Sequence, residues 1–226
     1  MSNPPLSPAP ANAGPLGRRG GLRFLRLGRV EYRECLERMR TAVDRRLAEG
    51  GPDEVWFVEH PPVITLGRRG ETGGIIAADG IPVVHSDRGG DVTYHGPGQL
   101  VVYPMLDLSR LGLGVRELVQ WLQRIIIEVL AGRGVAAELQ DGAPGVYVGA
   151  AKIASVGLRI RRRISYHGIS LNVDMDLGAF HRIHPCGREA LKMTQLSELC
   201  TGASPGAVAD EVEACFARRW RERCPS

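Results

Sequence analysis

Cys186 occupies a setting that the other cysteines of the chain do not share. It follows Pro185, lies outside any segment with helix or strand periodicity, and comes shortly after His181 and His184. Three roles fit the Cys186 side chain. It can be a small buried apolar residue, as most free cysteines are; it can bind a metal together with the two histidines; or it can act as a thiolate nucleophile. A metal site would need a further ligand at suitable spacing, so these residues alone leave the choice open.

Lys152 is the second residue whose type invites a chemical explanation. The chain contains 27 arginines but only two lysines, and no other charged residue occurs between Gly149 and Leu158. A lysine at this position can snorkel to solvent at a sheet edge. It can also hold a proton that must come and go, which arginine cannot do because its guanidinium stays protonated in proteins. The other lysine, Lys192, lies in an ordinary polar segment, so the scarcity of lysine does not by itself show that Lys152 has a chemical role.

A glycine-rich stretch, Arg88 to Leu100, surrounds a short Thr-Tyr-His strand. Its glycines allow a ligand to approach the backbone closely, although a hairpin loop rich in turn residues has the same composition. The triplet Tyr94-His95-Gly96 recurs as Tyr166-His167-Gly168 on another expected strand, so the two strands would line one pocket. The chain has no GxxxxGKS or GxxxxGKT phosphate loop and no GxGxxG turn between a strand and a helix, which excludes the common nucleotide motifs.

Hydrophobic periodicity predicts the elements that position these residues. Apolar residues three or four apart predict a helix from Tyr32 to Leu47, ended by a Gly-Gly pair. A second helix is expected over 115–130, and a third begins after the Ser204 N-cap with Pro205 in its first position. Strands are expected at 22–27, 54–60, 63–66, 83–85, 91–94, 99–106, 146–148, 153–160 and 165–173. Because the strands cluster without strict alternation with helices, the predicted fold class is α+β.

Length and composition place these elements in a single domain, 21–226, after a Pro- and Gly-rich tail, 1–20, that we expect to be disordered. The tail lacks the apolar stretch of a secretory signal. Its lack of acidic residues permits an organellar presequence, but its prolines would break the amphipathic helix. An odd number of scattered cysteines indicates a reducing compartment, so a cytoplasmic location is expected. No apolar run is long enough for a membrane span, and a net charge of +4 does not imply nucleic-acid binding.

Five segments together resemble the lipoyl(octanoyl) transferase family, whose members move an octanoyl group from acyl carrier protein to a lysine of a lipoyl domain. Each segment alone is a weak pattern, whereas five in the family's order are specific. They extend over about residues 22–200 and are Glu59 to Gly67 (EHPPVITLG), Arg88 to Leu100 (RGGDVTYHGPGQL), Lys152 to Gly157 (KIASVG), His167 to Val173 (HGISLNV) and Pro185 to Gly187 (PCG), the last followed by Met193-Thr194-Gln195.

The resemblance implies the fold of biotin protein ligases and lipoate ligases, a mixed or antiparallel sheet with flanking helices, which agrees with the α+β expectation. It implies that Cys186 carries the acyl group as a thioester, and that Lys152 lowers the pKa of this thiol and acts as a general base. The implied substrate-binding residues are Arg88, Gly89, Gly90, Asp91, Val92, Thr93, Tyr94, His95, Ser155, Val156, Gly157, Gly168, Ile169 and Ser170.

The resemblance also implies partners. The donor would be octanoyl-acyl carrier protein, and the acceptors would be lipoyl domains of dehydrogenase complexes and the glycine cleavage H protein. No metal, cofactor, nucleic acid or membrane is implied.

Other interpretations remain open from the sequence. An ATP-dependent lipoate or biotin ligase of the same fold would need a group to handle adenylate phosphates and would have no use for a nucleophilic Cys186. A non-catalytic lipoyl-carrier or nucleic-acid binding module would explain the basic charge. Separately, Arg159, Arg161, Arg162 and Arg163 surround an expected hairpin turn, either as a solvated tip or as a basic patch that steers an acidic carrier protein toward the pocket.

Overall fold

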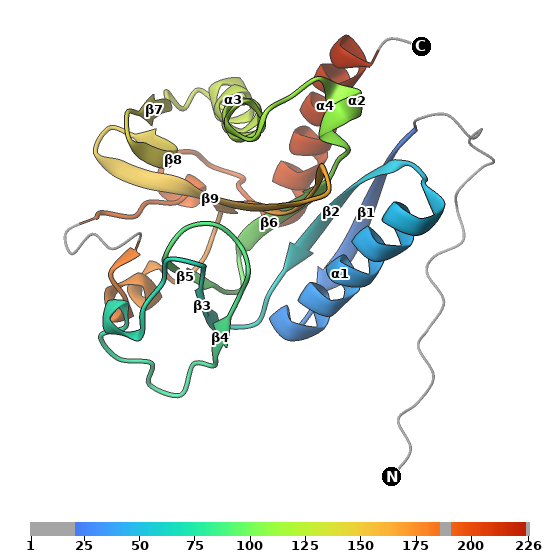
Figure 1. Cartoon of the computed structure of the whole chain (residues 1–226). Coiled ribbons are helices and arrows are strands. Elements are labelled where there is room, and N and C mark those ends of the chain that lie inside the picture. The colour runs from blue at the N-terminus through green and yellow to red at the C-terminus, as the bar shows by residue number, and fades with distance from the viewer. Residues whose placement is uncertain (1–20, 186–190, 225–226) are drawn as a thin grey trace.

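The computed structural model describes residues 21–185 and 191–224, whose strands form two sheets (Figure 1). In this part of the chain, the larger sheet has seven strands in the order β1-β2-β6-β10-β9-β8-β7, and the smaller has three in the order β4-β3-β5. The bounds are β1 Leu22–Arg29, β2 Asp53–Glu59, β3 Val63–Leu66, β4 Val83–His85, β5 Val92–His95, β6 Gln99–Met105, β7 Glu138–Gln140, β8 Ala143–Val148, β9 Ala151–Arg161 and β10 Ile164–Asn172.

The larger sheet is mixed, which confirms the α+β prediction. β1 pairs with β2 in parallel, whereas β2 with β6, β6 with β10, β10 with β9, β9 with β8 and β8 with β7 are antiparallel. β6 and β10 are buried along their whole length. Strands that are buried on both faces lie at the centre of a covered sheet, so these two strands form the middle of the molecule.

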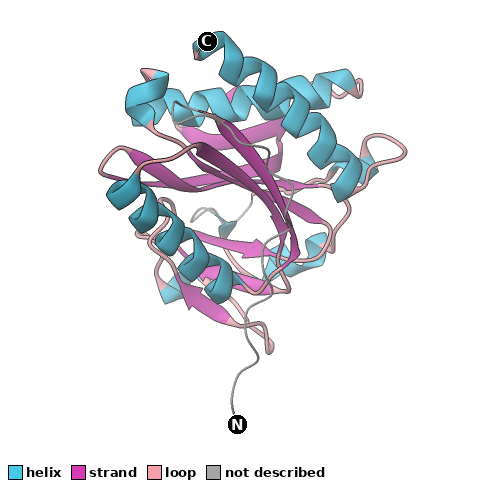
Figure 2. Ribbon diagram, turned by 90° about the vertical axis from the view of Figure 1, so that its right-hand side faces the viewer, coloured by secondary structure: helices cyan, strands magenta, loops and turns pink. Residues whose placement is uncertain are grey.

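Helices cover both faces of the large sheet (Figure 2). The helices are α1 Tyr32–Glu49, α2 Leu108–Leu111, α3 Val115–Gly132 and α4 Pro205–Arg223. α3 and α4 bury one apolar cluster against the sheet, and α1 buries a second cluster on the opposite face. The predicted stripe of α1 is buried at Tyr32, Leu36, Met39 and Val43, and its last residue, Leu47, is half-buried against the same cluster.

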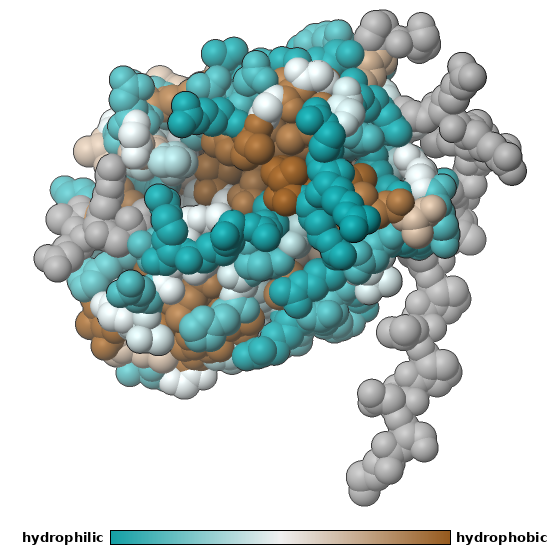
Figure 3. All heavy atoms as spheres, in the orientation of Figure 1, coloured by the Kyte–Doolittle hydropathy of each residue, from teal (hydrophilic) through white to brown (hydrophobic). Residues whose placement is uncertain are grey.

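The surface is hydrophilic over much of the view in Figure 3, with apolar side chains gathered near the centre of that face. The large apolar side chains that are themselves most exposed among the described residues are Ile76, Val115, Leu139 and Leu199. No helix in 21–185 or 191–224 is both long and apolar enough to cross a membrane.

The sequence analysis missed five short elements of the described residues. These are α2, β7 and the 3₁₀ helices η1 Thr72–Gly74, η2 Leu177–Arg182 and η4 Leu196–Glu198. Elements of three to six residues are too short to show a clear hydrophobic period. A local signal did exist for α2, because the Asp107 side chain accepts a hydrogen bond from the Ser109 N–H and caps the helix.

β9 and β10 form the predicted hairpin, with Arg162 and Arg163 in the turn at φ values of 45° and 73°. Positive φ at both central residues matches the twist of paired strands, although Asn-Gly is the usual sequence. Beyond the turn, Gly157 lies opposite Gly168 and Ser155 lies opposite Ser170. The tail predicted to be disordered, 1–20, lies outside the described residues.

Candidate active site

A pocket lies where β5, β9 and β10 meet α1 and β6, and it encloses about 480 Å³ of space counting its open mouth. All of the predicted substrate-binding residues line it except Gly89 and Tyr94. The structure adds four lining residues that the sequence analysis did not include in the binding set: Tyr32, Val101, Tyr103 and His167.

The two exceptions have separate structural reasons. Successive side chains of a strand point to opposite faces, so Thr93 and His95 line the pocket while Tyr94 packs with Phe180 in the core of the smaller sheet. Gly89 instead fixes the loop, because its N–H donates a hydrogen bond to the Leu158 carbonyl at 2.9 Å.

Two glycines in the pocket wall are required by close backbone contacts. A Cβ added at Gly157 would lie 2.7 Å from the Gly89 carbonyl oxygen, and one added at Gly168 would lie 1.9 Å from the Val102 carbonyl oxygen. The wall formed by Gly157 and Gly168 therefore stays thin, and the loop that begins at Arg88 packs directly on it.

Arg88 organises this loop from inside. Its side chain is 7% exposed and donates hydrogen bonds to both the hydroxyl and the carbonyl of Thr65. It also donates to the carbonyl oxygens of Gly89 and Asp91 at 3.0 Å and 2.6 Å. The Arg88 side chain thus ties the predicted binding loop to β3 while it lines the pocket.

A chain of buried amides fixes the proton of His95. The Asn172 side chain donates to the Thr194 carbonyl, so its oxygen accepts from the Gln99 side-chain amide at 3.0 Å. The Gln99 oxygen must then accept from His95 Nδ1–H at 2.7 Å. Burial lowers the pKa of His95 to about 3, so this imidazole is neutral at physiological pH and carries a lone pair on Nε2.

His60 is a second buried neutral imidazole behind the pocket. Its Nδ1–H donates to the Val30 carbonyl at 2.6 Å, which leaves Nε2 to accept from the Tyr103 hydroxyl at 2.8 Å. Burial lowers the pKa of His60 to about 4. The pocket floor near Tyr103 is therefore polar but uncharged.

Lys152 is 1% exposed, so the alternative of a lysine that snorkels to solvent is wrong. Its ammonium lies 5.4 Å from the centre of the Tyr147 ring, within the range of a cation–π contact. Gly145 leaves the space for its side chain, since a Cβ there would lie 2.1 Å from Lys152 Cε. Lys152 is thus a buried amine whose position is fixed by packing.

The backbone of Lys152 joins β9 to the segment that follows Cys186. Its N–H donates to the Lys192 carbonyl and its carbonyl accepts from the Thr194 N–H. Cys186 itself, predicted as the nucleophile, lies outside the described residues. The described residues nearest to it in sequence, Pro185 and Leu191, line a second hollow together with Lys192 and Met193.

The metal interpretation, which joined His181 and His184 to Cys186, also depends on a residue outside the described part. His181 is exposed on η2, and the backbone N–H of His184 donates to Gly74. Within 21–185 and 191–224, no three side chains from His, Cys, Asp or Glu are grouped as metal ligands.

Sequence comparison identifies similar proteins. The family model described as the lipoyl protein ligase A/B catalytic domain matches residues 31–217. An octanoyltransferase of Dechloromonas aromatica is 57% identical over 173 residues, which cover 76% of this chain and 84% of the relative. An octanoyltransferase of Stutzerimonas stutzeri is 51% identical over 193 residues, covering 85% and 88%.

Solved structures share the fold at low sequence identity. A lipoate-protein ligase A bound with ATP aligns with a TM-score of 0.67 at 18% identity, covering 89% of this chain and 85% of that one. A biotin protein ligase from Aquifex aeolicus aligns with a TM-score of 0.52 at 12% identity, covering 89% and 69%. The fold predicted from the sequence is confirmed by both.

Proposed function

The chain belongs to the family of the lipoyl protein ligase A/B catalytic domain, and on that premise we propose that it transfers an octanoyl group from octanoyl-acyl carrier protein to lipoyl domains through a thioester on Cys186. The protein is an acyltransferase that transfers octanoyl groups in protein lipoylation. The donor, the thioester and the acceptors are the proposed parts, together with a cytoplasmic location.

The position of Lys152 is the observation that carries this proposal. A buried amine near one end of the pocket wall is held by backbone hydrogen bonds to the segment 192–194, which begins six residues after Cys186. An ammonium close to a thiol stabilises the thiolate, which is the reactive form of cysteine. The neutral amine can afterwards accept a proton, so one lysine serves both halves of a transfer reaction.

The other cysteines support the choice of Cys186. Burial raises the pKa of the Cys35 thiol to about 12, and it also raises the pKa of Cys215 and of Cys224. These thiols stay protonated at neutral pH and are poor nucleophiles. The four described cysteines, which include Cys200, are free of disulfides.

The proposed reaction consists of two acyl transfers, first from the carrier protein to Cys186 and then from Cys186 to the acceptor lysine. The Cys186 thiolate attacks the carbonyl carbon of the donor thioester, the carbon–sulfur bond to the carrier breaks, and the carrier thiolate leaves with the proton of the Lys152 ammonium, which makes Lys152 neutral. The acceptor lysine amine then attacks the acyl-Cys186 carbonyl, the new carbon–sulfur bond breaks, and the proton lost by the amine passes to neutral Lys152. One thioester replaces another in the first step, so the acyl group stays activated without ATP.

The pocket suits the acyl chain of such a donor. Val101 provides an apolar wall on β6, and the thin wall at Gly157 and Gly168 leaves room beside it. We assign binding of the octanoyl group to the predicted residues that line this pocket, with Arg88 acting from within the loop that it organises.

Purified protein with octanoyl-acyl carrier protein and an isolated lipoyl domain tests the proposal. We expect octanoyl-lysine on the lipoyl domain, detected by intact mass, and none from free octanoate with ATP and Mg²⁺. Lys152→Met should abolish transfer, whereas Lys192→Met, which changes the only other lysine and one that is exposed, should not. Transfer from octanoate and ATP with an inactive carrier donor would instead identify a ligase.

A further inference from the structure

The pairing of β9 changes beside Lys152. The ladder between β9 and β10 reaches only to Ala154, two residues beyond Lys152. At Lys152 itself, β9 pairs instead with the segment 192–194 through one parallel bridge. This bridge has two hydrogen bonds, one donated by the Lys152 N–H at 2.8 Å and one accepted by the Lys152 carbonyl from the Thr194 N–H at 3.0 Å. A short irregular segment, rather than a strand, therefore lies beside the backbone of the proposed proton-transfer residue.

Asn172 supports this segment from β10. It is the last residue of that strand, and its side-chain amide donates to the Thr194 carbonyl at 3.0 Å. Thr194 thus receives Asn172 at its carbonyl and holds Lys152 through its N–H. The oxygen of the Asn172 side chain accepts from Gln99, which lies directly opposite Asn172 on β6. Asn172 is therefore fixed by the centre of the sheet and in turn fixes the residue that holds Lys152.

These hydrogen bonds are shielded from water. Asn172, Gln99 and Thr194 are each at most 8% exposed. A buried carbonyl that loses its donor has no water to replace it, so the loss is costly. Without the Asn172 amide, we expect the segment 192–194 to shift toward another donor, and the backbone of Lys152 to shift with it.

We propose that Asn172 is a positioning residue for octanoyl transfer, which acts through Thr194 to hold Lys152 where it accepts the proton of the acceptor amine. This inference rests on the proposed function. Asn172 does not line the pocket, so its contribution is to the rate of transfer and not to binding of the acyl group. A misplacement of about 1 Å in a reacting group lowers rates by about 10²-fold, which sets the scale of the expected effect.

Transfer from a preformed acyl-enzyme tests the proposal. Each enzyme is incubated with octanoyl-acyl carrier protein, the carrier is removed, and a lipoyl domain is added in excess. Intact mass follows the movement of the octanoyl group from the enzyme to the lipoyl domain. Only chains that have formed the acyl-enzyme are counted, so the rate constant does not depend on the folded fraction. A merely structural role of Asn172 would leave this rate constant unchanged.

Two variants remove the donor to the Thr194 carbonyl. Asn172→Asp keeps an oxygen that accepts from Gln99, but its ionised carboxylate has no proton to donate. Asn172→Leu has a side chain of similar size that cannot donate in any protonation state. Agreement between the two variants would show that the missing donor, and not a new charge, causes the effect.

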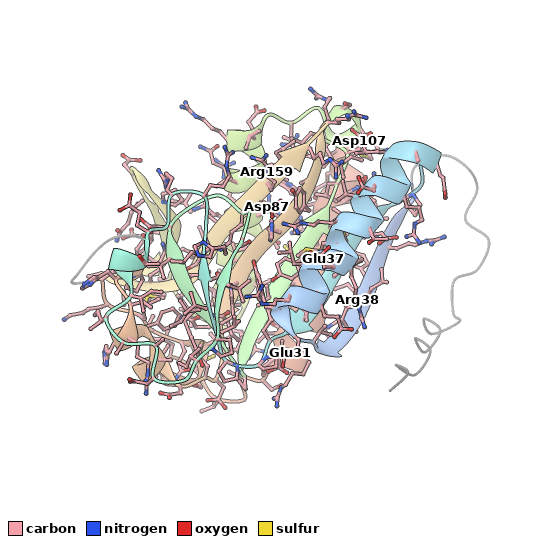
Figure 4. The ribbon with its side chains drawn as sticks, turned by 60° about the horizontal axis from the view of Figure 1, so that its bottom comes forward. Glu31, Glu37, Arg38, Asp87, Asp107 and Arg159 are labelled. Carbon is pink, nitrogen blue, oxygen red and sulfur yellow. The ribbon has the colours of Figure 1, made fainter. Side chains whose placement is uncertain are left out.

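Ser165→Ala is the matched control on the same strand. Ser165 is buried, and its hydroxyl also donates to a backbone carbonyl, that of Pro104 at 2.7 Å. It lies near the opposite end of β10, next to Tyr166. That part of the strand has a hydrogen-bond network of its own, in which Asp87, labelled in Figure 4, accepts from Tyr166 and His167. The control therefore removes a comparable buried hydrogen bond far from Lys152.

We expect the rate constant of transfer to fall about tenfold or more in both Asn172 variants and to keep the parent value in Ser165→Ala. An unchanged rate constant in the Asn172 variants, or an equal fall in Ser165→Ala, would overturn this inference and leave the proposed function intact. Absence of octanoyl transfer by the parent enzyme would overturn both.

Discussion

Gly145 packs directly against the proposed proton-transfer residue, and replacing it by alanine should displace Lys152. Gly145 lies on β8 with φ at 140°, and an added Cβ would be 2.1 Å from Lys152 Cε and 3.0 Å from Nζ. The same Cβ would be 2.7 Å from the Ala154 carbonyl oxygen. The Gly145 carbonyl is held by the Gln123 side chain at 2.7 Å, so the backbone has little freedom to move away.

The size of the effect follows from these distances. An ordinary contact begins at 3.4 Å, so Lys152 Cε must move by about 1.3 Å to accommodate the methyl group. A misplacement of about 1 Å in a reacting group lowers rates by about 10²-fold. The positive φ adds about 1–3 kcal/mol of backbone strain, which should lower the free energy of unfolding.

The assay is octanoyl transfer to a lipoyl domain at saturating donor, beside thermal unfolding of each variant. Gly51→Ala is the matched control, because Gly51 has φ at 131° and nothing within 4 Å of an added Cβ. We expect both variants to lose stability, and only Gly145→Ala to lose about 10²-fold in rate. A folded Gly145→Ala enzyme within about threefold of Gly51→Ala would refute the placement of Lys152 at the reaction centre.

Three further outcomes follow. Lys152→Arg keeps the positive charge but cannot act as a base. Alkylation of the Cys186 thiol at neutral pH should therefore persist, while the rate of octanoyl transfer to the acceptor falls by about 10²- to 10⁴-fold. Transfer near the parent rate would mean that Lys152 contributes only its charge. Replacing Arg161, Arg162 and Arg163 by Gln should raise KM for the carrier-protein donor and weaken the dependence of this KM on salt, while KM for a small octanoyl thioester stays unchanged. This is expected even though Arg161 pairs with Asp44 at 2.7 Å. If the salt dependence of KM for the carrier-protein donor is unchanged, the donor docks elsewhere. The pKa of His95 is about 3 in the folded protein and near 6.5 in the unfolded chain, so unfolding takes up a proton below about pH 6.5. The urea concentration at the unfolding midpoint should therefore decrease as the pH is lowered from 7 to 5, and His95 should have no effect on it above pH 7. An unchanged midpoint over this pH range would contradict the buried neutral imidazole.

Much of the fold was predictable because it depends on local patterns. The apolar stripe from Tyr32 to Val43 predicted α1, and the apolar segment around Lys152 predicted a strand, which is β9. The recurrence of Tyr-His-Gly also predicted that two strands would line one pocket, and His95 on β5 and His167 on β10 both line it. The helix and strand predictions share a cause, because each depends on neighbours within a few residues in sequence.

The contacts that complete the site could not be predicted in this way. Asp87 and His167 are 80 residues apart, and no periodicity links them. Tyr103 on β6 and His60, which directly follows β2, meet because β2 and β6 are neighbours in the sheet, and that order is a tertiary property. The positive φ of His167 opposes the usual preference of a strand residue, so a local rule would predict the wrong direction for its side chain.

The most direct measurement is the site of acylation. The enzyme is incubated with octanoyl-acyl carrier protein in the absence of any acceptor, quenched in acid, and examined by intact mass and peptide mapping. We predict one octanoyl group per chain on the peptide that carries Cys186, and no adduct in Cys186→Ser. An adduct on Cys35, Cys200, Cys215 or Cys224, or full transfer activity in Cys186→Ser, would contradict the thioester mechanism.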